Sequence, residues 1–222
     1  MLLLSFYGSR SQQYTSLPFK CAFKWAPFGI GDVVSGPNMK VGLDYRITKS
    51  VYGGLDGGAI FLPYPFRNNS GFFVRKELKF FTIAPKSWLS GEFYYWGFEA
   101  MYKYQEFSRR DSITIPGSTH TLKNYQVYKN TIALHAKVGF IWFSVKNHEA
   151  LTNEKEYPIF FAEFFAGAGI RQSTVYCAGL TDKEADNRKY EKYTIDVIGN
   201  LPNGTHVWPS FVLCIKFGWK LW

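Results

Sequence analysis

The stretch that decides the fold is FVLCIKFGWKLW, residues Phe211–Trp222. Its odd-numbered positions are apolar as far as Leu221, whereas its even-numbered positions include Lys216, Gly218 and Lys220. Strict alternation with a period of two predicts a β-strand with two unlike faces. An apolar face of this size has to be covered, either by the core of a protein or by lipid.

The same alternation recurs along the rest of the chain, in segments that are separated by turn-forming residues. The composition suits pleated strands, with 21 Phe, 15 Tyr and 7 Trp among 222 residues. The sequence therefore predicts eight strands, at about residues 19–28, 38–48, 51–61, 71–84, 88–106, 125–145, 159–175 and 211–221.

The predicted connections differ in length. Residues 48–50 and 84–87 make short links, whereas 62–70, 107–124 and 176–206 make long ones that are rich in Pro, Gly, Asn and Ser. The link at 146–158 is intermediate. Tight turns at one end and large loops at the other are typical of outer-membrane barrels. We expect residues 19–222 to form one domain, and residues 1–18 to be a signal-peptide remnant or a disordered N-terminus.

Charged residues and glycines share one face of the predicted strands. Glycine is costly inside a strand that faces water, but it makes room for long side chains in a narrow lumen. Lys24 and Lys79 also fall on this face. The predicted luminal polar network consists of Lys40, Asp44, Arg46, Asp56, Arg75, Glu77, Glu99, Lys103, His135, Lys137, Glu163, Arg171 and Lys216.

The opposite face is apolar and almost free of charge over nine to eleven residues per strand, which is enough to span a bilayer when the strand is tilted. A soluble barrel such as a lipocalin has the reverse arrangement. Aromatic residues lie toward the strand ends, as in the girdles of membrane barrels. The predicted girdle consists of Trp25, Trp88, Tyr102, Tyr104, Trp142, Trp219 and Trp222. Trp222 departs from the pattern, because it shares the parity of the lysines.

These observations predict an all-β fold, an eight-stranded antiparallel up-and-down transmembrane β-barrel. The net charge of +9 does not predict nucleic-acid binding, because the basic residues occupy alternate strand positions and form no recognition motif. The cysteines Cys21, Cys177 and Cys214 lack the spacing of a metal site, and we predict neither a metal nor a cofactor.

His135 is the one histidine that falls in a predicted strand. Its parity directs it to the lumen, so we interpret it as part of the polar network. The alternative is a catalytic base of a Ser/His/acid site, for which no local serine and acid pattern is evident. No catalytic residue is therefore assigned.

Four segments occur in the order GFFVRKELKFF (71–81), GFEAMYKYQEF (97–107), ALHAKVGF (133–140) and FFAGAGIRQ (164–172). Together with FKWAPFGIGD and GLDYRI near the start, they resemble small outer-membrane β-barrel proteins of Bacteroidota, a family described as a domain of unknown function. The resemblance covers about residues 20–220. It implies an eight-stranded outer-membrane barrel and carries over no catalytic residue.

Three functions remain open at this point. The first is a structural or accessory barrel of the bacterial outer membrane, with periplasmic termini, surrounded by lipid and bound to a larger envelope complex through a protein partner. The second is an outer-membrane enzyme that acts on lipid A or phospholipid. The third is a soluble, lipocalin-like ligand carrier.

Overall fold

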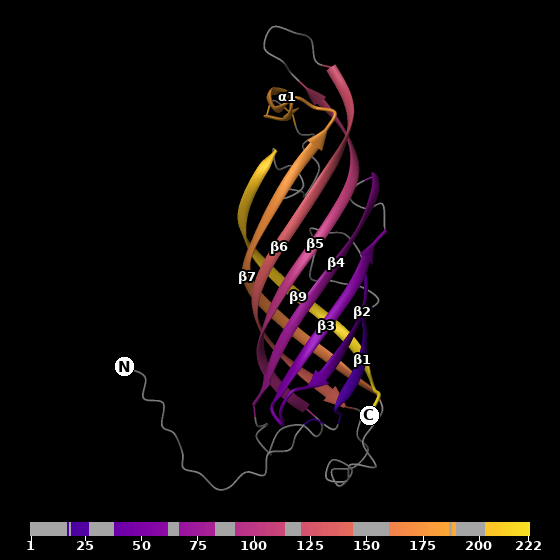
Figure 1. Ribbon diagram of the computed structural model, residues 1–222, viewed down its shortest axis with the longest axis vertical. Coiled ribbons are helices and arrows are strands. Elements are labelled where there is room, and N and C mark those ends of the chain that lie inside the picture. Colours follow the sequence, from indigo (N-terminus) through magenta and orange to yellow (C-terminus); the bar gives the residue numbers. More distant parts are fainter. Residues whose placement is uncertain are drawn as a thin grey trace, which may run out of the picture.

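The computed structural model describes residues 17, 19–26, 38–61, 67–82, 92–113, 121–143, 160–186, 188–189 and 203–222. Eight antiparallel strands form a closed ring in which each strand pairs with its neighbours in the chain, and β1 pairs with β9 (Figure 1). The eight strands are β1 (Cys21–Ala26), β2 (Asn38–Arg46), β3 (Val51–Ile60), β4 (Arg67–Phe81), β5 (Glu92–Ile113), β6 (Thr121–Phe143), β7 (Phe160–Ala178) and β9 (Gly204–Lys220). The predicted up-and-down β-barrel is confirmed.

The two ends of the barrel differ. At the end that we name the turn end, β2 and β3 are joined by a tight turn in which the Thr48 N–H donates to the Val51 carbonyl at 3.1 Å, as the short link predicted. At the opposite end, β5 and β6 continue as a paired ribbon beyond the other strands (Figure 1). We name this the ribbon end. The C-terminus lies at the turn end.

The predicted long loop at 107–124 is wrong for most of its length. β5 extends to Ile113 and β6 begins at Thr121, with unbroken pairing from Phe107↔Val127 to Ile113↔Thr121. The polar composition of this stretch suggested a loop, but its inward residues pack into an apolar cluster of Phe107, Tyr125, Val127, Val175 and Cys177.

The predicted loop at 176–206 is also partly structured. β7 continues to Ala178, a short helix α1 (Asp182–Asp186) follows, and β8 (Arg188–Lys189) pairs with the tip of β5. β9 begins at Gly204, ahead of the predicted start. Its Pro209 pairs with Ile170 of β7, and no described residue of β1 pairs with it on the other side. A sheet tolerates proline at such an edge position.

A β-bulge lies at Lys20 and Cys21, opposite Trp222, which follows the end of β9 and is exposed. The N–H groups of Lys20 and Cys21 both donate to the Trp222 carbonyl, at 2.7 and 3.0 Å, so two residues oppose one. The bulge changes the face of Phe19, which the alternation would place outward with Phe23. Phe19 is instead buried inside the turn end, where its ring stacks on that of Phe161.

Side chains fill the interior in three layers. An apolar cluster closes the turn end, where Phe19, Tyr52, Phe143 and Phe161 pack with their neighbours. Charged residues occupy the middle, and the apolar cluster around Phe107 lies toward the ribbon end, on β5 to β7. An eight-stranded barrel is just wide enough for such filling. Among the described residues, no helix has the length and apolar character of a membrane span.

Candidate functional site: the luminal ion cluster and the outer belt

The middle of the lumen holds a cluster of buried charges to which all eight strands of the ring contribute. Each side chain belongs to the inward parity of its strand, so the alternation seen in the sequence is what brings the charges together. We name this set the ion cluster. It consists of Lys24, Asp44, Asp56, Arg75, Glu77, Lys79, Glu99, Lys137, Glu163 and Lys216.

Glu77 lies at the centre of the ion cluster. Its carboxylate accepts hydrogen bonds from Lys24 at 2.8 Å and from Lys216, and it also binds Lys137. Lys137 reaches on to Glu99 at 3.1 Å, and Lys216 to Asp56. Because these partners come from β1, β3, β5, β6 and β9, ion pairs cross the lumen from several directions.

A second set of contacts surrounds Lys79 on the side of the turn end. Its Nζ lies 2.8 Å from Oδ2 of Asp44 and 2.6 Å from Oε1 of Glu163. The Tyr95 hydroxyl donates to the same Glu163 oxygen at 2.5 Å. These oxygen partners replace the water that each buried charge has lost, which a buried ion pair requires.

Glycines leave room for these side chains, as the sequence predicted. A Cβ atom at Gly54 would lie 2.6 Å from Oδ1 of Asp44 and 2.7 Å from Cγ of Glu77. Both carboxylates are held by lysines and cannot move aside without loss of ion pairs. Gly54 is therefore required by the ion cluster rather than by the backbone conformation.

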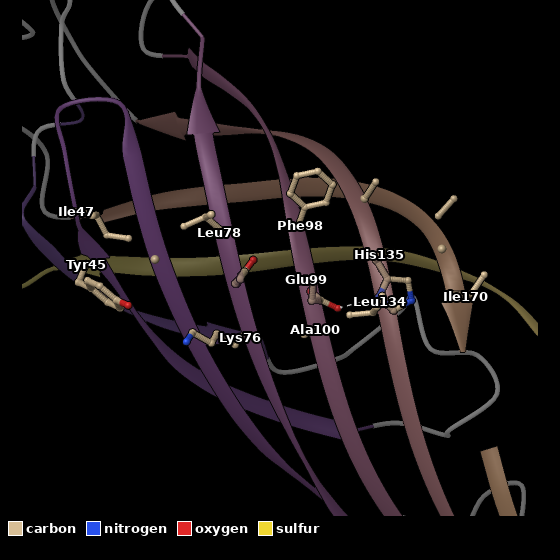
Figure 2. Close-up of a pocket in the computed structure, with 15 residues that line it drawn as sticks. Tyr45, Ile47, Lys76, Leu78, Phe98, Glu99, Ala100, Leu134, His135 and Ile170 are labelled. Carbon is tan, nitrogen blue, oxygen red and sulfur yellow. Dashed lines mark ion pairs between the residues drawn. The ribbon is translucent and has the colours of Figure 1, made fainter. Parts of the chain in front are cut away.

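On the ribbon side of the ion cluster, an acid, a histidine and a serine form a chain. Glu99 Oε1 lies 3.3 Å from His135 Nδ1 (Figure 2). His135 Nε2 lies 2.7 Å from Ser210 Oγ. Arg171 Nε donates to the same Ser210 oxygen at 3.1 Å. The approach of His135 Nδ1 to Glu99 Oε1 lacks hydrogen-bond geometry, so the three residues follow the order of a Ser–His–acid relay without its second hydrogen bond. All three side chains are buried in the lumen.

All thirteen residues of the predicted luminal network point inward. Twelve are buried and Arg46 is half-buried. Ser210 was missed because the last strand was predicted to begin at Phe211, although Ser210 shares the parity of Lys216. Extending the alternation by one residue would have found it.

The outward-facing side chains form an apolar surface around the barrel. We name it the outer belt. It consists of the outward residues of β1 and of one range on each of the other seven strands: Met39–Tyr45, Leu55–Ala59, Phe72–Phe80, Tyr94–Tyr104, Ile132–Trp142, Phe160–Ile170 and Phe211–Trp219. Large exposed side chains of the belt include Leu55, Phe98, Leu134 and Phe211, which are 53 to 70% exposed.

Aromatic residues of the outer belt gather at two levels. Toward the turn end, Phe80 stacks on Trp96 with ring centroids 4.4 Å apart. Toward the ribbon end, Phe72 contacts the rings of Tyr102 and Tyr104. Of the predicted girdle, Tyr102, Trp142 and Trp222 are exposed, while Trp25, Tyr104 and Trp219 are partly exposed. Trp88 lies outside the described residues.

A groove of about 810 Å³ crosses the outer belt over β2 to β7 (Figure 2). Outward Phe98, Leu134 and Ile170 line it together with the small Ala100 and Ala136, and inward-facing Glu99 and His135 also border it. A second groove of about 530 Å³ shares Phe98, Ala136 and Ala168 with the first and continues toward Trp96. One residue that the sequence interpretation missed, Lys76, lies within the first groove.

No family model, curated protein or solved structure matches the chain. Among the described residues, no group of three or more His, Cys, Asp or Glu side chains could hold a metal ion. The three cysteines are not joined by disulfides.

Proposed function

We propose that the chain is a β-barrel of the bacterial outer membrane that spans the bilayer with its eight strands. The observation that carries this proposal is the direction of the two faces: Lys, Arg and Glu lie inside the ring, and Phe, Leu, Ile and Val lie outside it. A soluble barrel would lose stability by exposing so much apolar surface to water, whereas lipid covers it at no such cost. Pairing of β1 with β9 closes the ring at Ala22–Trp25 and Phe217–Lys220, as a barrel that spans a bilayer requires.

In this proposal, the turn end and the C-terminus face the periplasm, and the β5–β6 ribbon extends outside the cell. Short periplasmic turns and longer extracellular segments are the usual arrangement of such barrels. The assignment to Bacteroidota rests on the resemblance of the strand segments alone.

We further propose that the barrel is an accessory subunit of an envelope complex and does not conduct. Ion pairs cross the lumen at Glu77, and apolar clusters lie on both sides of them. An ion would have to separate these pairs in order to pass. A barrel without a pathway through its lumen acts through its surfaces, which here are the ribbon, α1 and the outer belt.

The test is reconstitution of the purified protein into vesicles whose acyl chains carry bromine. The fluorescence of outward Trp96 and Trp142 should be quenched, because bromine atoms in the acyl chains quench the indole rings that they contact. Planar bilayers that contain the same preparation should show no channel openings. Fluorescence that is indifferent to bromine, or solubility without detergent, would overturn the membrane assignment. Regular unitary conductance would overturn the accessory role alone.

A second candidate function is a lipid hydrolase, favoured by the proximity of Glu99, His135 and Ser210, since Glu99 and His135 also border the outer groove. Ser210 would attack an ester carbonyl, His135 would take its proton, and the alcohol would leave as the acyl group is transferred to Ser210 Oγ. Water would then release the acid. Lipid profiles of cells that carry Ser210→Ala or His135→Ala should differ from wild type if this function holds, and unchanged profiles would exclude it.

A further inference from the structure

Lys76 is a cation on the apolar face of the barrel. It alternates outward with Phe72, Val74, Leu78 and Phe80 on β4 and is exposed. Its neighbours on the adjacent strands are Leu55 and Ala100. Among the described residues of the outer belt, Lys76 alone carries a charge.

The position of Lys76 along β4 makes its charge energetically unfavourable. It is the middle residue of the five outward residues from Phe72 to Phe80, so it lies near mid-depth if the outer belt marks the bilayer. A cation on the lipid face costs most at the midplane and little near the surfaces. Ionisable groups at that depth are functional sites by default and have a partner.

Lipid headgroups are poor partners for Lys76. The belt of a membrane barrel is about 25 Å tall, so phosphate groups lie about 12 Å above or below its middle. A lysine stem that bends toward the surface covers only part of this distance. The chemistry that neutralises Lys76 at its own depth is a carboxylate carried by another membrane-spanning segment.

The surface beside Lys76 suits such a segment. Alanines occupy outward positions on three adjacent strands, at Ala100 on β5, Ala136 on β6, and Ala166 and Ala168 on β7, and they form the floor of the two connected grooves. Small residues allow the backbone of a second element to approach closely within a membrane. Phe98, Leu134 and Ile170 provide larger side chains along the first groove.

A second copy of the chain does not provide the missing carboxylate. The described outer belt contains no Asp or Glu, and a symmetric contact through this surface would bring two Lys76 residues together. We propose that the groove over β4 to β7 binds a membrane-spanning segment of a different protein, with an Asp or Glu of that segment paired to Lys76. This inference rests on the proposed membrane barrel and identifies the kind of partner that it binds.

The experiment is photo-cross-linking in cells that produce the protein natively. A benzophenone amino acid replaces Leu134, which lines the groove, or outward Phe23 on β1, the strand opposite β5 in the ring. We expect a protein adduct from position 134 and none from position 23. The adduct should fall at least tenfold with Lys76→Glu and persist with Lys76→Arg. Changing the acidic residue in the membrane segment of the captured protein to Lys should restore the adduct of the Lys76→Glu variant.

Other outcomes overturn the inference. These are an adduct to lipid, an adduct that is indifferent to Lys76→Glu, the absence of any adduct, or a captured segment without a carboxylate. Heat-modifiable migration of each variant on gels shows that its barrel is folded, so a loss of adduct is not a loss of fold. Recovery of the folded protein outside the membrane fraction would instead overturn the proposed membrane barrel.

Discussion

Lys24 Nζ on β1 lies 2.8 Å from Glu77 Oε1 on β4, so a buried ion pair joins two strands that do not pair with each other. The contact crosses the lumen, and Glu77 receives further lysines from β6 and β9. The interior is thereby tied together by charge as well as by the hydrogen bonds of the sheet.

Replacing Glu77 by Gln should lower the free energy of unfolding by about 3–5 kcal/mol, because it leaves several buried lysines without their shared anion. The change in unfolding free energy is measured by urea titration of the protein in vesicles, with heat-modifiable migration on gels as the readout of the folded fraction. Glu106→Gln, on the outward face near the ribbon end, is the matched control and should change stability by no more than about 0.5 kcal/mol. Equal stability of the two variants would contradict the central role of Glu77.

Gly54→Ala should destabilise the barrel by about 1–3 kcal/mol, since the added methyl group meets Asp44 and Glu77. Gly57→Ala is the control on the same strand, because its Cβ would find no atom closer than 3.9 Å. The same urea titration compares them. The role assigned to Gly54 fails if Gly57→Ala is the more damaging change.

Lys76→Leu should raise the stability of the isolated barrel in vesicles of zwitterionic lipid by about 2–4 kcal/mol, the cost of a lysine at the bilayer midplane. Leu134→Lys, two strands away on the same face, should lower it by a similar amount. In cells, the same Lys76→Leu variant should associate more weakly with the proposed membrane-spanning partner. No gain from Lys76→Leu would place Lys76 outside the bilayer core.

The docking of α1 should weaken in acid. Thr181 and Glu184 form a capping box, in which the Thr181 N–H donates to Glu184 Oε2 at 3.0 Å and the Glu184 N–H donates to Thr181 Oγ1 at 3.4 Å. The hydrogen bond from Lys123 lowers the pKa of Glu184 below its ordinary value, with a further contribution from the Thr181 N–H. The stabilisation is complete above the ordinary carboxyl pKa of about 4.3 and is lost as the pH falls through the lower folded value.

Hydrogen exchange of the Ala185 amide, which donates to the Thr181 carbonyl at 2.9 Å, reports this change after correction for the intrinsic rate. Protection should fall in acid for the wild-type protein. Glu184→Gln should show weaker protection at neutral pH and no further loss on acidification. A wild-type protection factor that stays constant down to pH 3 would refute the assignment.

The alternation in the sequence predicted which side chains face inward, because face is a local property of a strand. It did so for Lys216 in the last strand and for Asp44 and Glu77 in earlier ones. It did not predict which charges meet. The pairing of Lys24 with Glu77 depends on the tilt and stagger of strands that are not neighbours in the ring, which no single segment encodes.

Strand ends were predicted less well, for a related reason. Residues near Asp111 have the composition of a turn, and they lie in a strand because Tyr125 and Phe107 pack nearby in the ribbon. The Tyr125 hydroxyl also binds the Asp111 carboxylate. Lys76 was overlooked because a single charge among apolar residues does not disturb the pattern, although that exception is what suggests a partner.

The ion cluster has a consequence for how the strands find their alignment. A period-two pattern is unchanged when a strand slides by two residues, so apolar and polar faces alone permit several alignments of neighbouring strands. Such a slide would carry a charge about 7 Å along the barrel. Each of the eight strands supplies a charged residue to the cluster. A slide of any one strand would therefore leave a buried ion without its partner of opposite charge. The outer surface thus determines which way each strand faces, and the charges inside determine how far along it must lie.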